Sequence, residues 1–205
     1  MSGQLDVFAH GEMMLAEGRS MDVVTQFKRI TPAQAFSADL ARAAAAAVIV
    51  EVADKVLEER HPQPELFALV SSTLGRLAAA ETDPRLELAD FLMRVLAELG
   101  YGPVLDVCAR CGGALGDRSL GFSAIAGGVV CSACNATFSV APTISARTIK
   151  ILRVLAAGDR DLFLRLKLDD GDIAAIEKAL EAQLEHHLDR QLKSVDFARQ
   201  VMRTS

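Results

Sequence analysis

Four cysteines constrain the fold of this chain more than any other feature of its sequence. Cys108 and Cys111 form one Cys-x2-Cys pair, Cys131 and Cys134 form a second, and 19 residues lie between the two pairs. This arrangement is typical of a four-thiolate zinc site, in which each pair supplies two corners of a tetrahedron around the metal. Because four protein ligands leave no position open for water, the sequence predicts one structural Zn²⁺ rather than a catalytic one.

Two disulfides, or four unrelated core thiols, are the alternatives to a metal site. A reducing cytoplasm disfavours disulfides, and chance placement of all four cysteines in two such pairs is improbable. Gly112 and Asn135 follow the two pairs, and both residue types tolerate the positive φ of a tight turn around sulfur. The short apolar segments 120–122 and 129–130 are predicted as the strands of a zinc ribbon within residues 105–142.

Helical periodicity dominates the chain on both sides of the cysteines. The predicted helices cover about 31–60, 64–80, 83–99, 145–157 and 172–192, with a short helical segment at 162–166. The first begins at Thr31-Pro32-Ala33-Gln34, which combines a capping threonine with a proline in the first turn. The second carries an apolar stripe of Leu66, Phe67, Val70, Leu74 and Leu77, which predicts a face turned to the core.

Residues 5–28 are predicted to form a β-hairpin. Apolar side chains occupy odd positions from Leu5 to Leu15, although Phe8 and Met14 break the alternation, and Glu17-Gly18-Arg19-Ser20 supplies the turn. An isolated hairpin is marginally stable in water, so we expect these strands to pack against something else.

The predicted fold class is therefore mainly α: a helical bundle with an inserted four-cysteine zinc ribbon and an N-terminal β-hairpin. The predicted organisation is a β region at 1–30, a first helical part at 31–104, the zinc-ribbon insert at 105–142 and a second helical part at 143–205.

The formal net charge of −5 argues against uniform coating by nucleic acid, because phosphate contacts need a local surplus of lysine and arginine. Two basic clusters are candidates for such contacts, although a solvated face is the commoner reason for such charges. The candidate DNA-binding residues are Arg19, Lys28 and Arg29 on the hairpin and Arg147, Lys150 and Arg153 on the helix after the cysteines.

Several function classes are disfavoured by what the sequence lacks. No apolar run reaches the length of a membrane span, and the N-terminus lacks the pattern of a secretory signal, so we expect a soluble, cytoplasmic protein. A phosphate-binding loop with lysine, a nucleophile elbow and a zinc-deaminase motif are absent, so we expect no enzyme activity and no catalytic residues. The acidic residues Asp169, Asp170 and Asp172 are expected at a solvated helix end.

The residues around the cysteines resemble the RecO family of DNA repair proteins. The resemblance runs from Phe91-x2-Arg94 through Leu99-Gly100-Tyr101-Gly102-Pro103 to the first cysteine pair, and from Phe122 through Gly127-Gly128-Val129-Val130 to the second. The front stretch, with Glu17-Gly18-Arg19-Ser20, is similar to the family's closing barrel strands, and His186-His187-Leu188 resembles its terminal helix.

The resemblance implies an N-terminal oligonucleotide-binding (OB) barrel, a helical domain and an inserted zinc module. It also implies a non-enzymatic, nucleoid-associated recombination mediator that binds single- and double-stranded DNA and anneals complementary strands. The implied protein partners are the tail of the single-stranded-DNA-binding protein and RecR, with a functional link to the loading of RecA.

One departure from the family pattern concerns the barrel. A five-stranded OB barrel needs much more chain than the segment that precedes the first predicted helix, so the hairpin is expected to be a remnant of it. Either the chain is a fragment or has a misassigned start, or it is a shortened family member. Both cases predict weak DNA binding by this chain alone. A zinc-stapled protein scaffold without DNA binding and, less favoured, an enzyme with a structural zinc ribbon remain the alternative functions.

Overall fold

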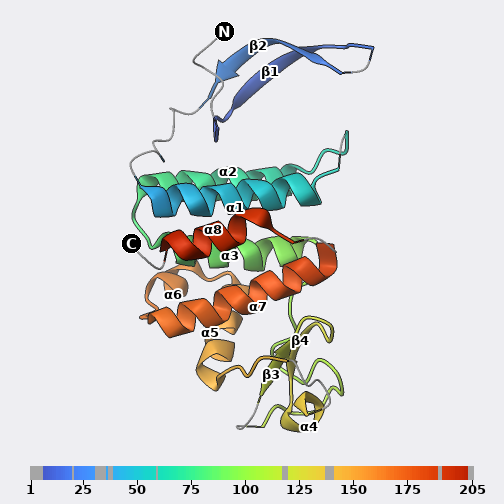
Figure 1. The fold of residues 1–205 in the computed structure, drawn as a ribbon, viewed down its shortest axis with the longest axis vertical. Coiled ribbons are helices and arrows are strands. Elements are labelled where there is room, and N and C mark those ends of the chain that lie inside the picture. Colours follow the sequence, from blue (N-terminus) through green and yellow to red (C-terminus); the bar gives the residue numbers. More distant parts are fainter. Residues whose placement is uncertain are drawn as a thin grey trace.

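The computed structural model describes residues 7–19, 21–30, 36, 39–58, 60–116, 120–136, 141–188 and 191–202. Four strands lie within these ranges: β1 (Gly11–Ala16), β2 (Val23–Arg29), β3 (Gly121–Ser123) and β4 (Gly128–Val130). The helices are α1 (Leu40–Val56), α2 (Pro64–Ala79), α3 (Pro84–Glu98), α4 (Ser132–Asn135), α5 (Ala146–Ala157), α6 (Arg160–Leu164), α7 (Asp170–Leu188) and α8 (Lys193–Met202). The predicted fold class is confirmed, since the chain is mainly helical with a small hairpin and a cysteine cluster (Figure 1).

Helix α3 forms the centre of the helical body. It packs against α1, α2, α5 and α7, and apolar side chains such as Phe91, Leu92 and Leu96 are fully buried. The alanine-rich α1 packs against α8, and its small buried side chains let the two helices approach closely. The hairpin and the cysteine-containing segment lie at opposite ends of this body (Figure 1). Among the described residues, no helix is both long and apolar enough to cross a membrane.

The helices with local capping signals begin and end as predicted. Asp83 accepts a hydrogen bond from the N–H of Arg85 at the start of α3. The hydroxyl of Ser145 caps α5, and Gly158 ends that helix with a left-handed backbone at φ 69°. The short segment predicted at 162–166 is the helix α6, which begins slightly earlier because Asp159 caps it.

Two predicted helix boundaries are wrong. Helix α1 is capped by Asp39 and ends at Val56 rather than near residue 60, while the start signal at 31–34 falls outside the described residues. The predicted final helix at 172–192 ends at Leu188, and a separate helix α8 follows. Leu192, the last residue of that predicted helix, instead lies buried just before α8.

The hairpin is confirmed, but it starts later than predicted. Strands β1 and β2 pair antiparallel from Gly11↔Arg29 to Ala16↔Val23, with an irregular register between Met14 and Leu15 where the alternation breaks. Residues 7–10 are not a strand, because Phe8 has a φ of 67° and its ring packs against Phe36 at 5.0 Å. The predicted positions Leu5 and Ser20 fall outside the described residues.

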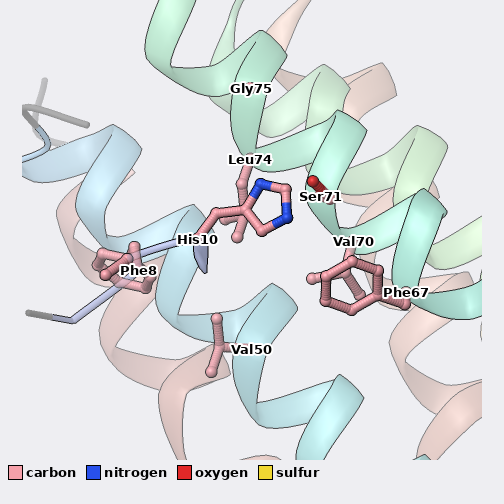
Figure 2. A pocket seen from close by; sticks show the side chains of 9 residues that line it. Phe8, His10, Val50, Phe67, Val70, Ser71, Leu74 and Gly75 are labelled. Carbon is pink, nitrogen blue, oxygen red and sulfur yellow. The ribbon is translucent and has the colours of Figure 1, made fainter. Parts of the chain in front are cut away.

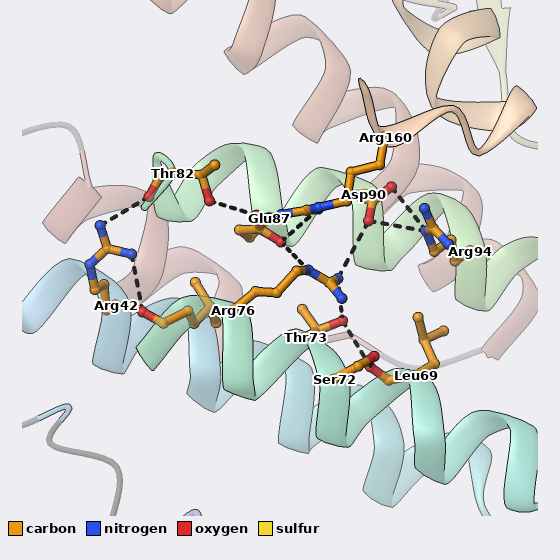
Figure 3. A network of polar contacts seen from close by, with 11 residues as sticks. Arg42, Leu69, Ser72, Thr73, Arg76, Thr82, Glu87, Asp90, Arg94 and Arg160 are labelled. Carbon is orange, nitrogen blue, oxygen red and sulfur yellow. Dashed lines mark hydrogen bonds and ion pairs between the residues drawn. The ribbon is translucent and has the colours of Figure 1, made fainter. Parts of the chain in front are cut away.

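A network of charged side chains connects helices α2, α3 and α6 (Figure 3). The carboxylate of Glu87 on α3 is fully buried and accepts hydrogen bonds from Arg160 of α6 at 2.7 Å and Arg76 of α2 at 2.9 Å. The hydroxyl of Thr82 donates a third bond at 2.5 Å. Burial alone would raise the pKa of Glu87, but these three donors outweigh it and hold the pKa below its ordinary value. Asp90, one turn later, pairs with Arg76 and Arg94.

Helix α8 receives its N-terminal cap from another helix. Glu51 of α1 accepts hydrogen bonds from the backbone N–H groups of Lys193 and Ser194 at 2.9 and 2.7 Å. The Ser194 hydroxyl and the Lys55 ammonium also contact this carboxylate. Burial raises the pKa of Glu51, but the bonds from Ser194, Lys193 and Lys55 outweigh it and lower the pKa from 4.5 to about 2. One carboxylate thus satisfies donors that the first turn of a helix leaves unpaired.

We expect Glu51→Gln to lower the free energy of unfolding by about 1–3 kcal/mol at pH 7, because it removes charge-assisted hydrogen bonds to α8. Since the folded pKa lies below the unfolded one, the carboxylate's contribution is complete above about pH 4.5 and is lost as the pH falls toward 2. The difference in the free energy of unfolding between wild type and Glu51→Gln should therefore shrink over that pH range. Urea unfolding, followed by the circular dichroism signal of the helices, measures this difference.

Asp54→Asn is the matched control, because Asp54 is exposed on the same helix. Equal stability of wild type and Glu51→Gln at pH 7 would contradict the capping role of Glu51.

Candidate functional site

The structure brings all four predicted metal ligands together. The sulfur atoms of Cys108, Cys111, Cys131 and Cys134 all lie within 4.8 Å of one another, and all four cysteines are free. Cys111 Sγ and Cys131 Sγ are 4.0 Å apart. A tetrahedron with metal–sulfur distances of about 2.3 Å has edges of about 3.8 Å. The cluster therefore has the size and the donor set of a tetrahedral thiolate site.

Each cysteine pair is shaped by a different backbone turn. In the first pair, the N–H of Gly112 donates to the carbonyl of Cys108 at 2.8 Å, and Gly112 has the predicted positive φ of 70°. In the second pair, the chain reverses through the one-turn helix α4, where the N–H of Asn135 donates to the carbonyl of Cys131. Asn135 is helical, so the prediction that it supplies a positive-φ turn is wrong.

The cysteine-containing segment is fastened to the helical body by backbone hydrogen bonds. Val104, just after α3, donates to the carbonyl of Gly127 and accepts from the N–H of Val129, both at 2.9 Å. A Cβ atom on Gly128 would lie 2.2 Å from the carbonyl oxygen of Val104, and the φ of Gly128 is 152°. Only glycine permits this close approach, which places the sheet of β3 and β4 against the chain leaving α3.

The surroundings of the cluster shift the pKa values of two of its thiols in opposite directions. Burial raises the pKa of Cys108, but backbone hydrogen bonds from Cys131, Cys111 and Arg110 outweigh it and lower the pKa to about 6. Burial, hydrogen bonds with the other thiols and the charge of Cys108 raise the pKa of Cys134 to about 12. Cys108 and Cys134 therefore differ in how readily they ionise. A divalent cation bound between thiols favours their deprotonated form.

The three predicted basic residues of the hairpin do not form one cluster. Arg19 is exposed in the turn, whereas Lys28 and Arg29 lie at the far end of β2, roughly 20 Å away for six residues of extended strand. Neighbouring residues of a strand point to opposite faces, so Lys28 and Arg29 do not share a face. Lys28 pairs in register with Glu12.

Two of the three predicted residues on α5 bind other parts of the protein. Arg147 Nε donates to both carboxylate oxygens of Asp172, at 2.8 and 3.0 Å. Arg153 donates to the carbonyl of Leu105 and forms an ion pair with Asp106 at 2.9 Å. Lys150 is exposed and makes no ion pair within the part of the chain that is described. The expectation that Asp172 is solvated is wrong, because Asp172 is buried beneath Arg147.

A pocket that the sequence analysis missed lies between the segment before β1 and helices α1 and α2 (Figure 2). It has a volume of about 300 Å³, and its described lining residues are Phe8, Ala9, His10, Val50, Phe67, Val70, Ser71, Leu74 and Gly75. Phe67, which we placed on a core-facing stripe of α2, is 55% exposed at this pocket. The pattern of α2 did contain a signal, since Ser71 and Gly75 interrupt the apolar residues at helical spacing.

Comparison with known proteins shows that the chain is similar to one family of DNA repair proteins. The family model for "Recombination protein O C terminal" matches residues 37–196. The chain is 38% identical over 200 residues to the DNA repair protein RecO of Frankia casuarinae, which covers 95% of this chain and 78% of that protein. It is 32% identical over 209 residues to the RecO of Roseiflexus sp., covering 100% of this chain and 73% of that protein.

A third relative, the DNA repair protein RecO of a Nocardioides species, is 34% identical over 200 residues, which cover 95% of this chain and 79% of the relative. The resemblance inferred from the cysteine pairs and their flanking residues is thus confirmed, and the chain belongs to the RecO family.

Proposed function

We propose that this chain is a non-enzymatic mediator of DNA repair and recombination, which binds DNA and partner proteins through a zinc-stabilised helical scaffold. The observation that carries the proposal is the family match over residues 37–196, together with the relatives named as DNA repair proteins. The proposed partners are single- and double-stranded DNA, the tail of the single-stranded-DNA-binding protein, and RecR. The proposed outcome is strand annealing and loading of RecA, in the cytoplasm at the nucleoid.

The proposed cofactor is one structural Zn²⁺ held by Cys108, Cys111, Cys131 and Cys134. The sulfur spacing and the all-thiolate donor set support zinc, which prefers tetrahedral sulfur coordination in closed sites. Zinc would stabilise the fold of the module without taking part in a reaction. Because β3 and β4 have only three residues each, the module depends on such a cross-link to keep its shape.

The proposed phosphate contacts are Arg19, Lys28 and Arg29 on the hairpin and Lys150 on α5. Arg147 and Arg153 remain candidates, but we expect them to contribute less to DNA affinity, because their guanidinium groups are already paired with Asp172 and Asp106. The net charge of −5 and the pairing of these two guanidinium groups support weak binding by this chain alone. Dissociation constants of about 10⁻⁴–10⁻⁶ M at physiological salt are typical of such electrostatic contacts.

We expect protein purified under reducing conditions to contain one zinc ion per chain. Cys108→Ser should lose the metal, because a hydroxyl is a much poorer zinc ligand than a thiolate. Elemental analysis and thiol alkylation measure both effects. Ser132 is exposed and follows the ligand Cys131, so Ser132→Ala should retain one zinc ion per chain and is the matched control. Wild-type protein without zinc, with four freely alkylated thiols, would refute the cofactor.

We expect Lys28→Ala and Arg19→Ala each to weaken the binding of single-stranded oligonucleotides. Each should also reduce the slope of log K against log salt by about 0.7, the value for one lost phosphate contact on a single strand. Lys150→Ala tests helix α5 in the same way. Lys178→Ala, an exposed lysine outside the proposed contacts, is the matched control.

A zinc-stapled protein scaffold without DNA binding is the second candidate, and the ion pairs of Arg147 and Arg153 favour it. Unchanged affinity and salt slope in the lysine and arginine variants would remove those residues from the proposed interface. Co-purification with RecR, in the absence of any measurable DNA binding, would favour the scaffold.

A further inference from the structure

The pocket between the segment before β1 and helices α1 and α2 is bounded by aromatic rings (Figure 2). The rings of His10 and Phe67 lie 5.5 Å apart with an interplanar angle of 61°, and Phe8 forms a third wall. The volume of about 300 Å³ lies at the small end of the range for ligand pockets. It suits one flat ring system rather than an extended chain.

The polar groups of the pocket indicate what kind of ring fits it. Within the described part of the chain, the Ser71 hydroxyl and the ring nitrogens of His10 line the pocket and make no hydrogen bond. No lysine, arginine, aspartate or glutamate is among its described lining residues, so a charged group would find no counter-ion there. A heteroaromatic ring meets both conditions, because its two faces are apolar and its edge carries hydrogen-bonding atoms.

A basic residue lies near the pocket, at the end of β2. The backbone carbonyl of His10 accepts a hydrogen bond at 2.9 Å from the N–H of Ile30, directly after β2. Arg29, the residue before Ile30, therefore lies next to the wall of the pocket, whereas Lys28 is on the opposite face of the strand and pairs in register with Glu12. A nucleobase in the pocket would bring its backbone phosphates toward the end of β2 at Arg29.

We propose that this pocket receives one unpaired nucleobase of single-stranded DNA, stacked on Phe67 with its polar edge toward Ser71 and His10. This inference rests on the proposed DNA-binding function and gives it a specific site. A base in a duplex is stacked and paired, so only a single strand can present one without the cost of opening the helix. The pocket thereby distinguishes single-stranded from double-stranded DNA.

Gly75 offers a direct test, because a Cβ at this position meets no atom within 4 Å and a longer side chain there would fill the pocket. We expect Gly75→Leu and Phe67→Ala each to weaken binding of a fluorescein-labelled oligothymidylate by about 5- to 100-fold, the effect of one lost stacking contact. The salt slope should stay unchanged, because neither variant removes a phosphate contact. Binding to duplex DNA and to an abasic oligonucleotide should match wild type.

The controls separate the pocket from general effects on the fold. Ala78→Leu places the same leucine side chain at an exposed position of α2 outside the pocket, and Phe197→Ala removes a phenylalanine that is 52% exposed on α8. Both should bind oligothymidylate like wild type. Gly75→Leu should unfold at or above the wild-type midpoint, because leucine favours the helix more than glycine.

These measurements separate a failure of the proposed DNA binding from a failure of the base pocket. If wild type binds no oligonucleotide, the proposed DNA binding and the base pocket both fail. If wild type binds but Gly75→Leu and Phe67→Ala leave the affinity unchanged, the base pocket alone fails. If Gly75→Leu instead weakens binding of an apolar, acidic peptide while oligothymidylate binding is unchanged, the pocket is a peptide site and the base pocket is refuted.

Discussion

The helical body depends on a carboxylate that has no contact with water. Glu87 lies in the first turn of α3 with its side chain fully buried, and an ionised carboxylate at such a position is stable only when hydrogen-bond donors surround it. Arg76 and Arg160 provide these donors from α2 and α6, so one buried charge fixes the positions of three helices (Figure 3). Removal of either partner from such a buried ion pair usually costs several kcal/mol, far more than an exposed pair contributes.

The sequence predicted those helix boundaries whose signals are local. Ser145 and Gly158 cap α5 with their own side chain and backbone, and Asp83 with Pro84 begins α3 in the same way. The division between α7 and α8 was missed because the cap of α8 comes from Glu51, which lies 142 residues before Lys193 in the chain. No pattern within the C-terminal segment contains that information.

The candidate site could likewise be predicted only where its signal is local in the sequence. The cysteine cluster was predictable because the spacing within each pair fixes the geometry of the turn around the sulfur atoms. The basic residues of α5 were not, since Arg147 and Arg153 find partners in Asp172 and Asp106, which are far away along the sequence. Phe67 fits the periodicity of a buried stripe, but the segment around His10 leaves a pocket next to the Phe67 ring. The division of the chain into four segments, and the origin of the hairpin in an OB barrel, stay predictions.

The backbone bridges around the cysteine module also determine how it is joined to the rest of the chain. Val104 forms an isolated bridge with Gly128 of β4, and Thr143 forms one with Gly121 of β3, so the entering and leaving segments flank the two-stranded sheet on opposite sides. Three inter-strand spacings of about 4.8 Å place the two ends about 14 Å apart. A linker of about five residues spans that distance. Such a short linker would nonetheless not replace the module, because Leu120, Phe122 and Val129 belong to the same buried core as the helices.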